Sequence, residues 1–129
     1  MLKTSVIIEW KDKKLNGSSI YRNNDIPLLI EIISDDNPSL IGISLNLEFY
    51  HYNGGSKTTI TKTSSGTGSN ITIEQLEPGF IRARTLLDAT ELAALPSTYD
   101  IGINYKLNAT FSDTSTTTIQ EGSFISTIS

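Results

Sequence analysis

The sequence contains no cysteine, which excludes disulfide bonds, thiolate metal sites and a cysteine nucleophile. Its single histidine is His51, so a histidine metal site would need carboxylates that folding brings beside that side chain. No catalytic group of residues stands out elsewhere in the chain. We therefore expect a protein that is not an enzyme and has no cofactor.

Positive charge is also scarce. The chain has 10 Lys and Arg residues against 14 Asp and Glu residues, which gives a formal net charge of −4. The basic residues form no cluster beyond Lys11, Lys13 and Lys14. Binding to a nucleic-acid backbone needs a concentrated basic surface, so nucleic acid is not an expected partner.

Long hydrophobic runs are missing as well. The longest, Ile26 to Ile33, is interrupted by Pro27 and Glu31 and is far shorter than the roughly 20 residues of a membrane-spanning helix. Met1 to Trp10 lacks the apolar stretch of a signal peptide. The length of 129 residues is typical of one domain. We expect one soluble domain, residues 1–129, without a membrane partner.

What the chain does have is residues that favour extended backbone. Serine and threonine account for 32 residues and isoleucine for 18, and Thr and Ile are β-branched strand formers. Apolar residues alternate with polar ones from Leu40 to Tyr52 and again from Tyr99 to Phe111. This period of two predicts two long strands, each with one buried face.

Weaker alternation predicts the remaining strands, and turn-forming residues such as Asn53-Gly54-Gly55 separate them. The segments are Thr4 to Lys11, Ile20 to Ile33, Lys57 to Thr63, Asn70 to Glu74, Gly79 to Arg84 and Thr116 to Ile128. Connections this short favour antiparallel pairing. The pattern indicates an all-β fold, an antiparallel β-sandwich or barrel of about eight strands, and we expect the sandwich.

One short helix is expected between two of these strands. Asp88 and Glu91 have the spacing of a capping box, and Leu87 and Leu92 can pack together across the start of the helix. Pro96 ends the pattern. The sequence predicts a two-turn helix from Asp88 to Leu95.

Polar residues offer few candidate sites. Asp35, Asp36 and Asn37 could supply oxygens to calcium, but they precede Pro38 and are better explained as a turn. Glu74 and Glu77 flank another turn and are better explained as solvated residues than as an acid and base pair. We therefore expect His51 at the surface or in a hydrogen bond, and no metal site.

Partner-binding residues are predicted in two places. Tyr50 and Tyr52 lie on the strand face opposite the core and could contact a partner or stack on a sugar. The segment from Thr116 to Ile128 has no lysine or proline to protect a sheet edge. We expect it to pair with a neighbouring chain. Its apolar anchors would be Phe124, Ile125 and Ile128.

Three segments of the chain resemble a known family. They are Arg22-Asn23-Asn24-Asp25 with the alternating Ile26 to Ile32, the long strand from Leu40 to Tyr52, and the run from Ile71 through Asp88 to Leu95, Pro96 and Tyr99-Asp100-Ile101. Together they are similar to the N-terminal β-sandwich of phage baseplate upper proteins and related tail-fibre attachment modules. The sequence departs from that pattern at Asn23-Asn24 and at Ser97-Thr98.

The resemblance implies a bacteriophage virion structural protein, made in the host cytoplasm. Such a protein would dock in the tail or baseplate, or decorate the capsid, through contacts with other virion proteins in a homo- or hetero-oligomeric assembly. The aromatic residues leave a second interpretation open, namely a carbohydrate-binding or adhesion β-sandwich module. Neither interpretation involves catalysis.

Overall fold

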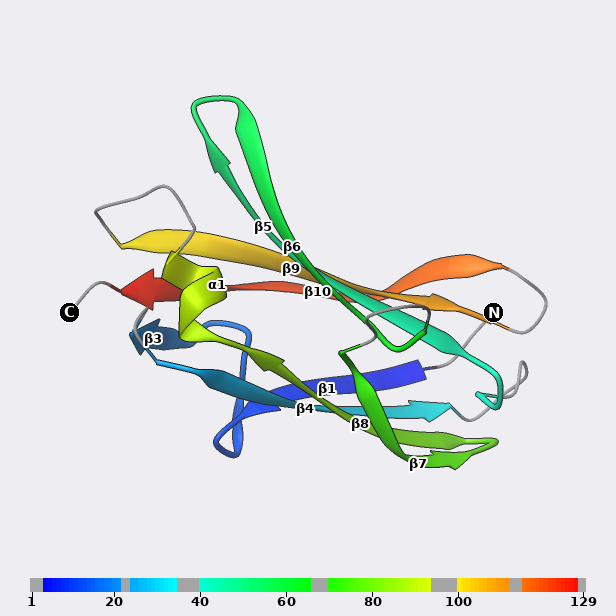
Figure 1. Ribbon diagram of the computed structural model, residues 1–129. Coiled ribbons are helices and arrows are strands. Elements are labelled where there is room, and N and C mark those ends of the chain that lie inside the picture. The colour runs from blue at the N-terminus through cyan, green and yellow to red at the C-terminus, as the bar shows by residue number, and fades with distance from the viewer. Residues whose placement is uncertain are drawn as a thin grey trace.

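The chain folds into two β-sheets that pack face to face as a sandwich (Figure 1). The computed structural model describes residues 4–21, 24–34, 40–65, 70–93, 100–111 and 115–127. The first sheet contains β1 (Thr4–Trp10), β2 (Lys13–Lys14), β4 (Ile26–Ser34), β7 (Thr72–Glu77) and β8 (Phe80–Leu87). The second contains β3 (Ser19–Tyr21), β5 (Ser44–Asn53), β6 (Ser56–Thr63), β9 (Ile101–Thr110) and β10 (Thr116–Thr127).

The strand order is β2-β1-β4-β8-β7 in the first sheet and β3-β10-β9-β5-β6 in the second. All pairs are antiparallel except β10 and β3, which run parallel between Ile125–Thr127 and 19–21. The predicted antiparallel β-sandwich with one short helix is confirmed. The described residues form ten strands where about eight were expected, because β2 and β3 are too short to show alternation.

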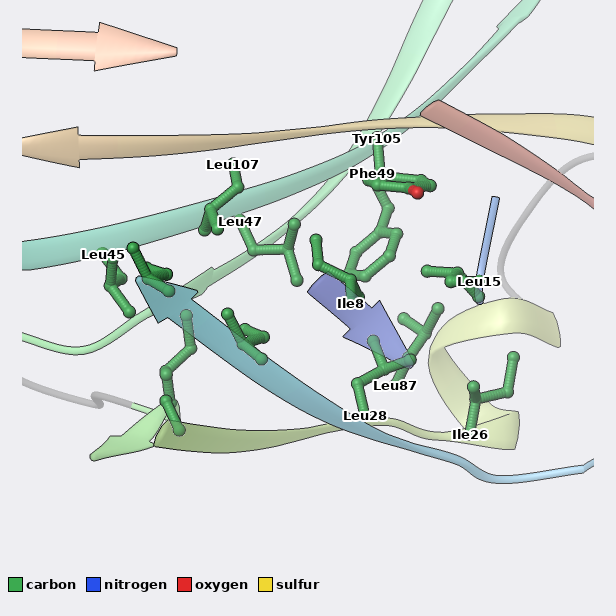
Figure 2. Close-up of a cluster of buried hydrophobic side chains, with 14 of the residues drawn as sticks. Ile8, Leu15, Ile26, Leu28, Leu45, Leu47, Phe49, Leu87, Tyr105 and Leu107 are labelled. Atoms are coloured by element: carbon green, nitrogen blue, oxygen red, sulfur yellow. The ribbon is translucent and has the colours of Figure 1, made fainter. Parts of the chain in front are cut away.

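The core lies between the sheets and is built by alternating residues of the long strands. On β5 and β9 the inward residues are Leu45, Leu47, Phe49, Ile103, Tyr105, Leu107 and Ala109, each at most 1% exposed. Figure 2 shows several of these side chains meeting Ile8, Leu28 and Leu87 from the first sheet. The face assignment predicted for the two long strands is therefore correct within β5 and β9, whereas Ile41, which precedes β5 and was also expected on the buried face, is 50% exposed.

The helix is shorter than expected, with α1 spanning Ala89–Ala93. Its start is the predicted capping box: the Glu91 amide donates to Asp88 Oδ1 at 2.7 Å, and the Asp88 amide donates to Glu91 Oε1 at 3.1 Å. Glu91 also accepts from Lys62 Nζ at 2.6 Å. Lys62 is 5% exposed, so this ion pair lets β6 bury a lysine beneath the helix.

Gly122 on β10 packs closely against Tyr105 on β9. These residues are paired in register, and a Cβ atom at Gly122 would lie 2.5 Å from the Tyr105 hydroxyl oxygen and 2.7 Å from its Cζ. Tyr105 is 1% exposed and cannot swing away. Glycine is required at position 122 because there is no room for a Cβ atom, and not because of its backbone φ angle.

We expect Gly122→Ala to lower the free energy of unfolding by about 1–3 kcal/mol through overpacking. Gly102→Ala is the matched control, since a Cβ at Gly102 on β9 meets nothing within 4 Å. Chemical denaturation of both variants is the measurement. Adding Tyr105→Phe to Gly122→Ala should restore part of the loss. Equal stability of Gly122→Ala and the parent chain would contradict the packing described.

Candidate functional site

The β5–β6 hairpin extends beyond the sandwich as a two-stranded ribbon (Figure 1). β5 pairs with β9 only from Ser44 to Tyr50, whereas its pairing with β6 continues to Asn53 and Ser56. Gly54 and Gly55 both have positive φ angles, 58° and 91°, which a two-residue hairpin turn of this type requires. The end of the ribbon therefore extends past β9, and Tyr52 and Lys57 near its tip are exposed.

Tyr50 and Tyr52 form an aromatic pair on the outer face of this ribbon. They are two residues apart on one strand, so their side chains point to the same face. Their ring centroids are 5.9 Å apart with an interplanar angle of 83°, an edge-to-face contact. Lys57 Nζ lies 4.7 Å from the Tyr50 ring centroid. Tyr50 is thus partly covered, whereas Tyr52 is 56% exposed.

Polar residues surround the two tyrosines on the same face of the second sheet. Tyr50 is opposite Thr59 on β6 and Asn104 on β9. One step further along the sheet, Glu48 and Lys106 form an ion pair at 3.6 Å. This face therefore carries the exposed ring of Tyr52 beside several hydrogen-bonding groups. We call Tyr50, Tyr52, Lys57, Thr59 and Asn104 the tyrosine face.

His51 lies on the opposite side of the ribbon from the two tyrosines. Its Nδ1 atom is 3.2 Å from the carbonyl oxygen of Gly102, at the start of β9. This hydrogen bond ties the base of the ribbon to the neighbouring strand. The expectation of a surface or hydrogen-bonded histidine is confirmed.

The apolar anchors predicted on the last strand have different environments. Phe124 is 1% exposed and contacts Phe49 edge-on, with centroids 6.3 Å apart. It belongs to the core, so its predicted role as a surface anchor is wrong. Its neighbour Ile125 points outward and is 44% exposed. Ile128 lies outside the described residues.

The last strand also has less unpaired edge than a strand at the border of a sheet would have. β10 pairs with β9 along one side, and Ile125–Thr127 pairs with β3 along the other. Only the part of β10 from Thr116 to Gly122 has no strand on its second side among the described residues. The predicted edge is therefore confined to the first half of β10.

The acidic candidates are engaged in ordinary surface contacts. Glu74 accepts from Arg84 Nε at 2.7 Å, and Glu77 accepts from the side-chain amide of Gln75 at 3.3 Å. In the described part of the chain no group of three or more His, Asp or Glu residues could hold a metal ion. The turn at 35–38 lies outside the described residues. No described helix is long and apolar enough to cross a membrane.

Comparison with solved structures gives a weak likeness. No protein-family model and no curated protein sequence matches the chain. Among solved structures, the chain is similar to AggA, the major subunit of aggregative adherence fimbriae type I from Escherichia coli. The TM-score is 0.43 and the identity 9%, over 100% of this chain and 96% of the fimbrial chain.

The expectation of a phage virion structural protein is corrected at this point. The solved structure named above is that of a fimbrial subunit and not of a phage protein, and no family model matches the chain. The segments that resemble the baseplate family are short and degenerate, and they follow the strand and turn pattern that many β-sandwiches share. Their likeness to that family stays a prediction from the sequence.

Proposed function

We propose that this chain is a non-enzymatic adhesion module that binds carbohydrate through the tyrosine face. The observation that carries the proposal is the exposed ring of Tyr52, which Tyr50 contacts edge-on at the end of a protruding ribbon. The edge-to-face contact restricts the orientations that the exposed ring can adopt. A sugar is the ligand that such a ring suits best.

The chemistry of stacking supports this ligand class. The face of a tyrosine ring carries partial negative charge, and the ring face of a pyranose presents several weakly polarised C–H groups. Contacts of this kind are individually weak. They gain strength when the ring is held before the ligand arrives, because less side-chain entropy is lost on binding. The contact with Tyr50, itself covered by Lys57, holds Tyr52 in this way.

Hydroxyl groups of a sugar also need hydrogen-bonding partners. Thr59, Asn104 and Lys57 offer a hydroxyl, an amide and an ammonium group on the same face. Lys57 and Thr59 are exposed, and Asn104 is half-buried. The site is shallow, so we expect weak binding by one copy and stronger binding when several copies act together.

We expect Tyr52→Ala to weaken binding to a glycan surface by about tenfold or more, the effect of losing roughly 1.4 kcal/mol of stacking. Tyr21→Ala is the matched control, because Tyr21 on β3 is 52% exposed but lies apart from the tyrosine face. The measurement is a glycan array probed with the tagged full chain, followed by titration with each glycan that binds.

Two results would contradict the proposal. One is an array on which the multivalently displayed chain binds no glycan. The other is equal loss of binding in Tyr52→Ala and Tyr21→Ala, which would show that the tyrosine face is not the site. Asn104→Ala should give an intermediate loss, since it removes hydrogen bonds and leaves the aromatic pair intact.

A further inference from the structure

Polar side chains on the outer face of the second sheet differ in whether they bond to one another. Away from the tyrosine face they pair across strands, as where the Thr118 hydroxyl donates to Asn108 Oδ1 at 2.6 Å. On the tyrosine face, the side chains of Lys57, Thr59 and Asn104 take part in no hydrogen bond or ion pair among the described residues. Their polar groups are therefore open to a ligand.

Lys57 is the positive charge of the tyrosine face. It is paired in register with Tyr52 on the neighbouring strand, and directly opposed residues point to the same face of a sheet. Its Nζ atom lies 4.7 Å from the Tyr50 ring centroid, which is 5.9 Å from the Tyr52 ring centroid. The ammonium group has three N–H donors, so its contact with one ring leaves donors for another partner.

No carboxylate on the neighbouring strands balances this charge. Glu48 is the only acidic residue on β5, β6 and β9, and it pairs with Lys106 at 3.6 Å. It is four residues from Tyr52 along β5, about 13 Å at about 3.3 Å per residue, which exceeds the Debye length of about 8 Å at physiological salt. The chain as a whole has a net charge of −4, so the positive charge of this face is a local feature.

We propose that the sugar bound by the tyrosine face is a uronic acid, whose ring stacks on Tyr52 and whose carboxylate pairs with Lys57. This inference rests on the proposed function. A uronic acid carries its carboxylate directly on the pyranose ring, at the ring's edge. Lys57 likewise lies to one side of Tyr52, over the adjacent ring of Tyr50. A sulfate ester extends further from the sugar through an additional oxygen, so it suits this arrangement less well.

The probes are methyl β-glucuronide and methyl β-glucoside, which differ only in a carboxylate or a hydroxymethyl group on the same ring. Each is titrated into the full chain by NMR, with the chemical shifts of the Tyr52 ring as the measure of binding. We expect the glucuronide to bind about two- to fivefold more tightly, the effect of one exposed ion pair. This preference should disappear in about 0.5 M salt, which screens such a pair. The corresponding galacturonide and galactoside give a second matched pair.

Three lysine variants test the role assigned to Lys57. Lys57→Gln should remove the preference for the glucuronide, whereas Lys57→Arg should keep it, because arginine retains the positive charge. Lys13→Gln is the matched control, because Lys13 is an exposed lysine of β2 in the first sheet. It should leave the preference at its original value.

Several results would overturn the uronic acid and leave the carbohydrate proposal standing. One is equal affinity for the charged and neutral sugars of both pairs, with binding still lost in Tyr52→Ala. Another is a loss of glucoside affinity in Lys57→Gln as large as the loss of glucuronide affinity, which would show that Lys57 only covers Tyr50. Tighter binding of methyl glucoside 6-sulfate than of the glucuronide would identify sulfate as the preferred anion.

Failure of the carbohydrate proposal itself would look different. In that case no glycan on the array binds, and neither uronic acid shifts the Tyr52 ring signals at millimolar concentration. If neutral glycans bind on the array while both uronic acids leave these signals unchanged, only the inference about the carboxylate is wrong.

Discussion

Phe124→Ala is expected to lower the free energy of unfolding by about 3–5 kcal/mol, the usual cost of removing a buried aromatic side chain. Phe124 is 1% exposed and contacts Phe49 edge-on. It is also paired in register with Ile103, another core residue. Truncation would open a cavity between β5, β9 and β10 that these neighbours cannot close.

Ile125→Ala provides the matched control for this prediction. Ile125 is the next residue on the same strand but is 44% exposed, so its truncation should cost about 1 kcal/mol or less. Urea denaturation of both variants is the measurement. Similar losses for the two residues would mean that the assignment of their faces is wrong.

The same geometry decides what a C-terminal truncation would do. Removing residues 122–129 deletes Phe124 from the core and removes the pairing of Ile125 and Ser126 with β9 and of Ile125–Thr127 with β3. Among the described residues, β3 would then have no neighbouring strand in the second sheet. We conclude that this end of the chain is part of the sandwich, and that a test of docking should target single edge groups instead.

The long strands were predictable because one face of each is buried and the other is solvated. Leu45, Leu47 and Phe49 alternate with Asn46 and Glu48, and the structure places the first set inside and the second outside. The capping box at Asp88 was predictable for a similar reason, since both of its hydrogen bonds are local. Local patterns of this kind need no knowledge of distant pairing.

The last strand carries a bulge that interrupts its alternation. The register of β10 against β9 shifts between Thr118 and Gln120, which places one extra residue in the strand. An alternation of inward and outward residues that is extended across this bulge assigns the residues on one side of it to the wrong faces of the strand. In addition, Phe124 and Ile125 are adjacent and must point to opposite faces, so they could not both be surface anchors.

The pairing of strands that are far apart in the chain could not be predicted from the sequence either. β3 is a three-residue strand that pairs in parallel with residues more than 100 positions later, and a turn closed by the Asn24 amide and the Tyr21 carbonyl separates it from β4. The sequence merged both into one strand from Ile20. The tyrosine face is an intermediate case: alternation predicted the shared face of Tyr50 and Tyr52, but not their neighbour Asn104 from β9.

The second large effect is expected from Leu45→Ala and Ile103→Ala. Leu45 is 0% exposed and Ile103 is 1% exposed, so each truncation should cost about 2–5 kcal/mol. Leu45 is opposite Ala109, six residues along β9 from Ile103, which is about 20 Å at about 3.3 Å per residue. Sites this far apart do not share a cavity, so the two losses should add.

Together the two losses amount to about 4–10 kcal/mol, against a total stability of about 5–15 kcal/mol for a typical domain. The double variant should therefore be largely unfolded at room temperature, whereas each single variant stays folded. Circular dichroism with urea titration is the measurement, and Thr61→Ala on the exposed face of β6 is the control. An unchanged melting temperature for either single variant would contradict the core described here. The double variant could instead be as stable as the less stable of the two single variants. That result would show that the two ends of the sandwich are coupled, because only a rearrangement shared by both sites would remove the stability loss of the second substitution.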